Sequence, residues 1–244
     1  MPILSLQNVE YAYPDGNVAV SGVSFGIGEG ESVGLVGANG AGKSTLLMML
    51  PGALQPRAGE ILIQGEKLTK ANAPALRRAV GLVFQDADDQ LFTSTVRDDV
   101  AFGPRNTGLD EASVEEAVNR VLEATGIAAL MDRAPWKLSG GEKKLASIAS
   151  ILSMDPKLLV MDEPSASLDP RARRKIIELV NRLPQAKLIA SHDLDLVWDT
   201  CSRVIVLKQG KVAADGNAKT ILADEKLLTE CGLELPMRLM PPVG

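Results

Sequence analysis

Residues 37–44 read Gly-Ala-Asn-Gly-Ala-Gly-Lys-Ser, which matches the phosphate-binding pattern G-x-x-x-x-G-K-S. The octapeptide follows the apolar segment 32–36, which predicts a strand, and leads into residues 42–50, which predict a helix. Glycines allow positive φ angles and bring backbone N–H groups close to phosphate oxygens at the start of that helix. The pattern therefore predicts a nucleotide-binding α/β protein. The alternative, a glycine-rich turn that ends by chance in Lys-Ser, is disfavoured by the flanking strand and helix.

The same pattern assigns roles to individual residues of the loop. Lys43 is expected to contact the β- and γ-phosphates, and the Ser44 hydroxyl is expected to bind Mg²⁺. The other candidate nucleotide-binding residues in this segment are Gly37, Asn39, Gly40, Ala41, Gly42 and Thr45.

Composition disfavours several other classes of protein. The 26 basic and 31 acidic residues give a net charge of −5, so nucleic acid is not expected as a partner. Cys201 and Cys231 lack C-x-x-C spacing, and His192 is the single histidine, which excludes a multi-histidine metal site. The N-terminus does not resemble a signal peptide, and no apolar run approaches the roughly 18 residues of a membrane span. We expect a soluble chain whose association with a membrane is peripheral.

Hydrophobic patterning predicts an α/β core interrupted by helices. Residues 3–9 and 18–27 read as an antiparallel hairpin ahead of the loop, joined by the turn residues 14–17. Helices are expected from Asp110 to Gly126 and from Glu142 to Met154. We predict a core of residues 1–86 and 156–235, an inserted helical lobe of residues 87–155 and a tail of residues 236–244. Further strands are expected at 61–63, 80–84, 158–161, 187–190, 204–207 and 212–214.

An apolar strand that ends in two acids supplies the expected catalytic carboxylates. Residues 158–164 read Leu-Leu-Val-Met-Asp-Glu-Pro, the Walker B pattern, which delivers both acids to the carboxyl end of a buried strand. Asp162 is expected to hold Mg²⁺, and Glu163 to orient or deprotonate the attacking water. The alternative is an acidic turn that caps a helix.

A second pattern identifies a family. Residues 138–142 read Leu-Ser-Gly-Gly-Glu, which by itself is more typical of a helix N-cap than of a ligand site. In the order phosphate loop, Gln85, residues 138–142, Asp162-Glu163, Asp169 and His192, the chain resembles the ATP-binding-cassette (ABC) ATPases along almost its whole length. The resemblance implies a P-loop NTPase fold with a RecA-like core, an antiparallel β edge and an inserted helical lobe.

The resemblance also implies how such a chain works. Two cassettes pack head to tail, and each ATP lies between one phosphate loop and the signature residues of the second cassette, here Ser139, Gly140, Gly141 and Glu142. Gln85 resembles the Q-loop residue that contacts Mg²⁺ or the attacking water, and Asp169 resembles the aspartate of the D-loop. His192 matches the switch histidine, which binds the γ-phosphate beside Glu163. Tyr13 matches the aromatic residue that stacks on adenine, with Tyr11 as its nearest rival.

Residues 11–16, 83–92 and 99–104 resemble a narrower branch, the energy-coupling-factor ATPases. That branch drives uptake of cobalt, nickel or vitamins through a membrane coupling protein and a substrate-capture protein, from the cytoplasmic face of the membrane. Three residues depart from its usual pattern: Ala87 replaces Pro, Ser165 replaces Thr, and Leu145 replaces Arg. None removes a catalytic group, so we expect an active ATPase.

Two questions stay open at the level of sequence. Leu91 and Phe92 either meet the coupling protein or pack inside the helical lobe. The chain could also serve another ABC transporter branch, or act as a soluble ABC ATPase outside transport. It has neither the long insertion typical of repair cassettes nor the second cassette typical of translation factors.

Overall fold

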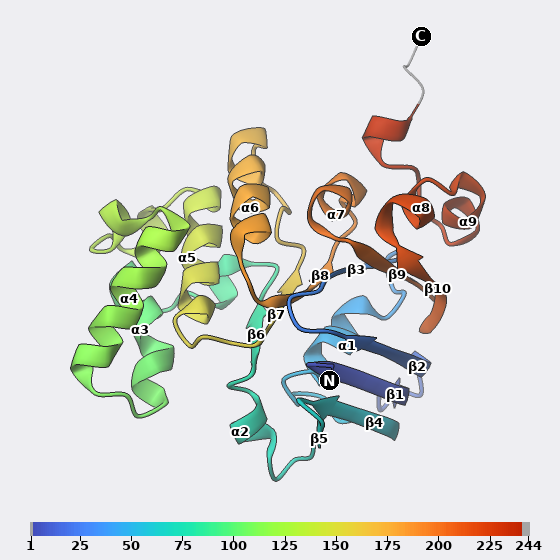
Figure 1. The fold of residues 1–244 in the computed structure, drawn as a ribbon, viewed down its shortest axis with the longest axis horizontal. Helices are drawn as coiled ribbons and strands as arrows, with labels where there is room; N and C mark the ends of the chain where they lie inside the picture. The colour runs from blue at the N-terminus through green and yellow to red at the C-terminus, as the bar shows by residue number, and fades with distance from the viewer. Residues whose placement is uncertain (1, 241–244) are drawn as a thin grey trace.

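The computed structural model describes residues 2–240, and its largest element is a six-stranded sheet in the order β10-β9-β3-β8-β7-β6 (Figure 1). The pairs among β9, β3, β8, β7 and β6 are parallel, and β10 joins β9 as an antiparallel edge strand. Ligands bind beyond the carboxyl ends of such parallel strands. The strands are β3 (Ser32–Val36), β6 (Val80–Val83), β7 (Leu158–Asp162), β8 (Ala186–Ala190), β9 (Arg203–Lys208) and β10 (Lys211–Asn217).

A smaller antiparallel sheet packs against the first through a shared core. Its order is β2-β1-β4-β5, and the pairing of β1 with β2 confirms the predicted hairpin. Helix α1 (Lys43–Met49) contributes Leu46, Leu47 and Met49, which are fully buried among side chains of both sheets. This packing fixes the phosphate loop between the two sheets. The strands are β1 (Leu4–Ala12), β2 (Val18–Ile27), β4 (Ala58–Ile63) and β5 (Glu66–Lys67).

Helices cover the face of the six-stranded sheet that is turned away from the smaller sheet. Other helices form a separate group at the left of Figure 1. That group holds α3 (Val96–Asn106), α4 (Glu111–Thr125) and α5 (Gly140–Leu152), within the segment predicted as an inserted lobe, whose exact bounds stay a prediction. The remaining helices are α2 (Ala73–Leu76), α6 (Pro170–Arg182), α7 (Leu194–Thr200), α8 (Ala218–Leu222) and α9 (Glu225–Glu230). Short 3₁₀ turns are η1 (Ala87–Asp89), η2 (Ala128–Leu130), η3 (Pro135–Lys137) and η4 (Met237–Leu239).

The helix ends show which local signals decided the boundaries. Asp110 caps α4 by accepting a hydrogen bond from the backbone N–H of Ser113 at 2.9 Å, and Gly126 ends the helix with φ +72°, as predicted. Helix α5 begins at Gly140, two residues before the predicted start, because Ser139 and Glu142 form a capping box. The start predicted at Glu142 was two residues late, whereas the N-cap interpretation of residues 138–142 is confirmed at Ser139.

The tail, to which the sequence assigns no secondary structure, contains a short turn among the residues that the structure describes. Met237–Leu239 form a turn whose Arg238 Nε donates to Asp195 Oδ1 at 2.7 Å, and Arg238 Nη2 donates to Asp199 Oδ2 at 2.8 Å. These contacts attach the turn to α7. The Pro241-Pro242 pair lies outside the described residues.

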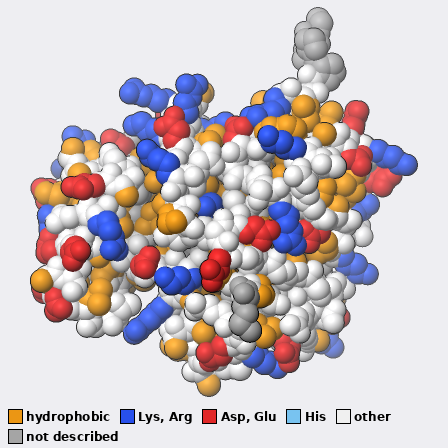
Figure 2. All heavy atoms as spheres, viewed as in Figure 1, with side chains coloured by type: hydrophobic (Ala, Val, Ile, Leu, Met, Phe, Trp, Pro, Cys, Tyr) orange, Lys and Arg blue, Asp and Glu red, His pale blue; other side chains and the backbone are white. Residues whose placement is uncertain are grey.

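The surface shows no feature of a membrane span within residues 2–240, because none of their helices is both long and apolar enough to cross a bilayer. On the face drawn in Figure 2, basic and acidic side chains are interspersed over the whole outline.

Candidate active site

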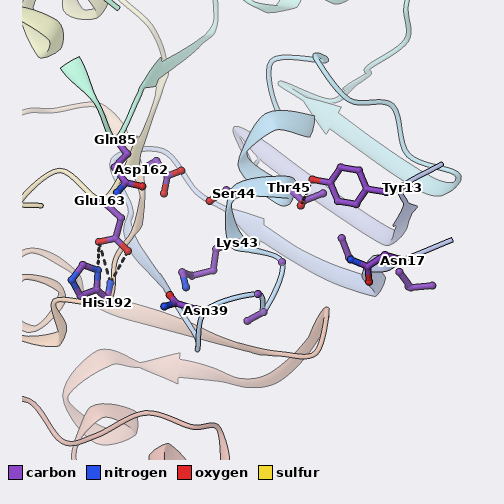
Figure 3. A pocket seen from close by; sticks show the side chains of 15 residues that line it. Tyr13, Asn17, Asn39, Lys43, Ser44, Thr45, Gln85, Asp162, Glu163 and His192 are labelled. Atoms are coloured by element: carbon purple, nitrogen blue, oxygen red, sulfur yellow. Dashed lines mark hydrogen bonds and ion pairs between the residues drawn. The ribbon is translucent and has the colours of Figure 1, made fainter. Parts of the chain in front are cut away.

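A cavity of about 560 Å³ lies between the two sheets, beside the phosphate loop (Figure 3). It brings together residues that the sequence places far apart, from the first hairpin to the end of β8. The lining residues are Tyr13, Asn17, Val18, Ala19, Asn39, Gly40, Ala41, Gly42, Lys43, Ser44, Thr45, Gln85, Asp162, Glu163 and His192. Most of the predicted cis-acting site residues therefore share one cavity.

The phosphate loop is held in shape by its lysine and its glycines. Lys43 Nζ donates to the carbonyl oxygen of Gly37 at 2.6 Å and to that of Ala38 at 3.3 Å, across the loop. Gly42 has φ +103°, and a Cβ there would overlap the carbonyl oxygen of Ala19. Gly42 is therefore required both by backbone conformation and by space. Gly37, which does not line the cavity, contributes the carbonyl that positions Lys43.

The surroundings of Lys43 would favour the binding of an anion. Burial lowers the pKa of the Lys43 ammonium below its usual 10.5, while the carboxylates of Glu163 and Asp162 oppose that shift. A nucleotide phosphate beside Lys43 would add negative charge and so stabilise the ammonium form. The group is arranged to gain interaction energy when an anion enters.

Glu163 and His192 form a hydrogen-bonded pair at one end of the cavity (Figure 3). His192 Nδ1 lies 2.8 Å from Glu163 Oε2, and the backbone N–H of His192 donates to Glu163 Oε1 at 3.0 Å. The hydroxyl of Ser191 donates to Glu163 Oε2 at 2.9 Å. Glu163 is only 7% exposed and has φ +45°, a conformation that non-glycine residues rarely adopt. The carboxylate is therefore held in one orientation.

Three oxygen donors suitable for Mg²⁺ line the same cavity: the Ser44 hydroxyl, the Gln85 amide and the Asp162 carboxylate. Within residues 2–240, His, Cys, Asp and Glu side chains form no cluster of three or more that could hold a metal ion alone. Mg²⁺ is commonly bound by one or two carboxylates together with waters and substrate phosphates, so this donor set fits Mg²⁺ that arrives with a nucleotide. Burial raises the pKa of Asp162, while a hydrogen bond from Ser44 opposes that shift. A divalent cation would favour the carboxylate form.

Tyr13 stands at the end of the cavity opposite Glu163 and His192 (Figure 3). Its hydroxyl is 2.9 Å from Thr45 Oγ1, which ties the first hairpin to helix α1. The Tyr11 ring packs edge-on against it, with centroids 5.1 Å apart, but Tyr11 does not line the cavity. The geometry favours Tyr13 over Tyr11 as the aromatic residue that meets adenine.

Comparison with known proteins identifies the family. The family described as "ABC transporter" matches residues 20–166. This chain belongs to the ABC transporter family. It is an ABC ATPase, with the mixed α/β cassette fold, which binds ATP and hydrolyses it in the context of transport.

The similarity to known proteins covers nearly the whole chain. A Geobacter sulfurreducens protein, named as an ABC transporter ATP-binding protein without a stated substrate, is 50% identical over 97% of this chain and 95% of its own length. The energy-coupling factor transporter ATP-binding protein EcfA of Methanothermobacter thermautotrophicus is 44% identical over 96% of this chain and 77% of its own length. The solved structure of cbiO1 from Clostridium perfringens superposes with a TM-score of 0.85 at 38% identity, covering 96% of each chain.

The signature residues of the cassette do not reach the nucleotide cavity. Ser139, Gly141 and Glu142 line a separate cavity of about 240 Å³ together with Asp169. Gly140 lines a third cavity, which it shares with Gln85 and Asp162. Within this chain Ser139 and Asp169 serve as helix N-caps; Asp169 Oδ1 accepts from the N–H of Arg171 at 2.8 Å.

Four residues of the cassette's site are not among those predicted from the sequence. Asn17, Val18 and Ala19 line the cavity because strand β2 begins beside the phosphate loop, and only their position after the turn at Asp15-Gly16 hints at this. Ser191 orients Glu163 through its hydroxyl. The sequence signal that could have identified Ser191 is its position between an apolar strand and His192.

The three departures from the branch pattern are accommodated within the fold. Ala87 and Leu145 are buried in the apolar core of the helical group, at 7% and 6% exposure. The Ser165 hydroxyl donates to Asp193 Oδ2 at 3.1 Å. None of the three lines the nucleotide cavity.

Proposed function

We propose that this chain is the ATPase subunit of an energy-coupling-factor-type importer, taking up cobalt, nickel or a vitamin. Support comes from the 44% identity to an energy-coupling factor ATP-binding protein and from the likeness to cbiO1, described as part of the ABC transporter complex cbiONQ. The partners would be a second cassette, identical or homologous, and a membrane coupling protein with a substrate-capture protein. The chain would lie peripherally on the cytoplasmic face of the membrane.

One observation carries the proposed dimer: the chain holds a phosphate loop and a signature in different cavities. A nucleotide bound at Lys43 is therefore not contacted by Ser139 of the same chain. Head-to-tail pairing would supply Ser139, Gly140, Gly141 and Glu142 from the second cassette, with the N-terminus of the 13-residue helix α5 directed at the γ-phosphate. Asp169 would lie at the interface between cassettes.

The residues of the cavity support hydrolysis by an attacking water. Lys43 would bind the β- and γ-phosphates and stabilise charge as the terminal phosphoryl group transfers to water. Glu163 would accept the proton of that water, and His192 would hold the γ-phosphate and keep Glu163 oriented. Ser44, Gln85 and Asp162 would hold Mg²⁺, which supplies charge neutralisation on the phosphates. Tyr13 would stack on adenine.

An exposed aromatic pair marks the face proposed for the coupling protein. Phe92 is 67% exposed and Phe102 is 47% exposed, with ring centroids 4.9 Å apart in an edge-to-face arrangement. Leu91 is only 7% exposed and packs in the core, so of the two residues considered from the sequence only Phe92 remains a contact candidate. Exposed apolar side chains of this kind are typical of interaction sites.

The test is affinity purification of this chain from detergent-solubilised membranes of its native cell. We expect recovery of a small multispan coupling protein together with a substrate-capture protein. Recovery of an ordinary permease pair would favour another ABC transporter branch, and recovery of ribosomal or nucleic-acid components alone would contradict transport coupling. Phe92→Asp should abolish recovery without loss of ATPase activity. Met237→Asp, at an exposed apolar position on η4 (81% exposed against 67% for Phe92), is the control and should leave recovery unchanged.

A further inference from the structure

The segment that follows β6 is bound to helix α5 by a buried lysine. Strand β6 ends at Val83, and Gln85 then enters the nucleotide cavity. Lys144, on the second turn of α5, is 3% exposed, and its Nζ donates to the carbonyl oxygens of Phe84 at 2.9 Å and Gln85 at 2.7 Å. The carbonyl of Gln85 and that of the residue before it are therefore bonded to the helix that begins at the signature.

Gln90 connects the same segment to α5 through the backbone N–H of Phe84. Gln90 Oε1 accepts from the backbone N–H of Phe84 at 3.2 Å. The Nε2 of the same side chain donates to the carbonyl oxygen of Ser147 at 2.6 Å and to Ser150 Oγ at 2.9 Å, both on α5. Donor and acceptor groups of Phe84 are thus both connected to the helix, through Gln90 and Lys144.

Burying a lysine is costly, so its partners require an explanation. Burial lowers the pKa of Lys144, and the carboxylates of Asp86 and Asp162 oppose that shift. If Lys144 served only to stabilise the fold, its partners would not need to lie near the nucleotide cavity. The two carbonyls that it binds, however, belong to Gln85 and to the residue before it, and Gln85 lines that cavity.

We propose that Lys144 and Gln90 are positioning residues that make Gln85 and the signature helix α5 move as one unit. When Gln85 engages the γ-phosphate side of the cavity, α5 follows and places Ser139–Gly141 for the nucleotide of the second cassette. Loss of either contact lets Gln85 move without the signature. The proposal rests on the head-to-tail dimer of the proposed function, which it deepens by naming the residues that transmit the movement.

The chain offers a matched control for the lysine. Lys187 is 5% exposed, burial lowers its pKa, and its Nζ also donates to two carbonyls, those of Leu183 at 2.8 Å and Gln185 at 3.0 Å. Lys187 lies in β8, and those carbonyls belong to the loop before it rather than to any cavity-lining segment. Lys144→Met and Lys187→Met therefore remove the same chemistry, one beside Gln85 and one remote from it.

The experiment measures kcat and KM for ATP, and the melting temperature, for the full chain and its Lys144→Met, Lys187→Met and Gln90→Met variants. We expect both lysine variants to lose similar thermal stability, while only Lys144→Met loses kcat, by ~10- to 100-fold as for a misplaced catalytic group. Its KM should stay within about twofold, because phosphate-loop contacts are untouched. In a Glu163→Gln background, Lys144→Met should bind ATP normally yet need more ATP to dimerise.

Gln90→Met keeps the experiment decisive if Lys144→Met does not fold, because Gln90 is only half-buried. It should show the same loss of kcat at unchanged KM. The proposal is overturned if a folded variant keeps wild-type kcat, or if Lys187→Met loses as much as Lys144→Met. If affinity purification recovers no membrane protein, the proposed importer function is contradicted, but the kcat and KM comparisons between the variants still test the present proposal. Failure of the Glu163→Gln chain itself to dimerise with ATP would contradict the dimer.

Discussion

His192 Nδ1 lies 2.8 Å from Glu163 Oε2, and the backbone N–H of the same histidine donates to the other carboxylate oxygen at 3.0 Å. Two contacts from one residue therefore fix the orientation of a carboxylate that sits on a left-handed backbone, at φ +45°. Such a conformation costs about 1–3 kcal/mol and persists where surrounding structure imposes it. We expect this oriented carboxylate to accept a proton from the attacking water.

Replacing Glu163 with glutamine tests that role. Glu163→Gln keeps the size of the side chain and an acceptor for Ser191 and His192, but removes the proton acceptor, so kcat should fall by ~10²- to 10⁴-fold. ATP affinity should be unchanged. Phosphate release and binding of a fluorescent ATP analogue measure the two quantities. Unchanged steady-state hydrolysis would show that another group activates the water.

Two substitutions of Tyr13 test the proposed adenine contact, one that removes the ring and one that removes only the hydroxyl. Tyr13→Ala removes the proposed stacking surface, worth ~1–3 kcal/mol per base, and should weaken ATP binding by ~5- to 150-fold. Tyr13→Phe loses only the hydrogen bond to Thr45 and should weaken binding by at most about tenfold. Calorimetric titration with ATP distinguishes the two. Equal losses would show that the hydroxyl, not the ring, is what matters.

Gly42 should be the less replaceable of two glycines in the phosphate loop. Gly42→Ala combines φ +103° with overlap between the new Cβ and the Ala19 carbonyl, whereas Gly40 has φ +77° and open space around it. We expect Gly40→Ala to cost about 1 kcal/mol of unfolding free energy and Gly42→Ala at least about 2–3 kcal/mol. Urea unfolding measures both. A similar cost at the two positions would show that the Ala19 contact relaxes freely.

Stability should depend on pH through Asp99, a buried residue of α3. Burial raises the pKa of Asp99 above its usual 3.8, although the N–H groups of Phe92 and Thr93 favour the carboxylate, and its Oδ2 has no hydrogen-bond partner among the described residues. A raised pKa means that the folded state holds the proton more tightly. This contribution to stability is fully present below pH 3.8 and is lost as the pH rises through the folded-state pKa.

Asp99→Asn removes that dependence while keeping an acceptor for Phe92 and Thr93. The unfolding free energy of the variant minus that of wild type should therefore increase with pH from about 4 upward and level off above the folded-state pKa. Urea unfolding at a series of pH values measures the difference. A difference that stays flat with pH would show that the carboxylate is ionised at no cost in the folded chain.

Much of the fold could be predicted because its signals are local. The apolar run before Asp162 and the caps Asp110 and Gly126 report on residues within a few positions, so β7 and α4 appear close to where the sequence places them. The sequence left a question open where a distant partner decides the structure. Leu91 is buried because the helical core closes over it, and Met237–Leu239 form a turn because Arg238 meets Asp195 across 43 positions.

The phosphate loop and the strand that ends in paired acids follow from residue spacing and glycine content, because those features act over a few neighbouring positions. Three contacts depend instead on packing: His192 orients Glu163 across 29 positions, Tyr13 reaches Thr45 across 32, and Lys144 bonds to the carbonyl of Gln85 across 59. The direction of each side chain depends on how the sheets and helices pack, and packing is a property of the whole chain rather than of any short segment.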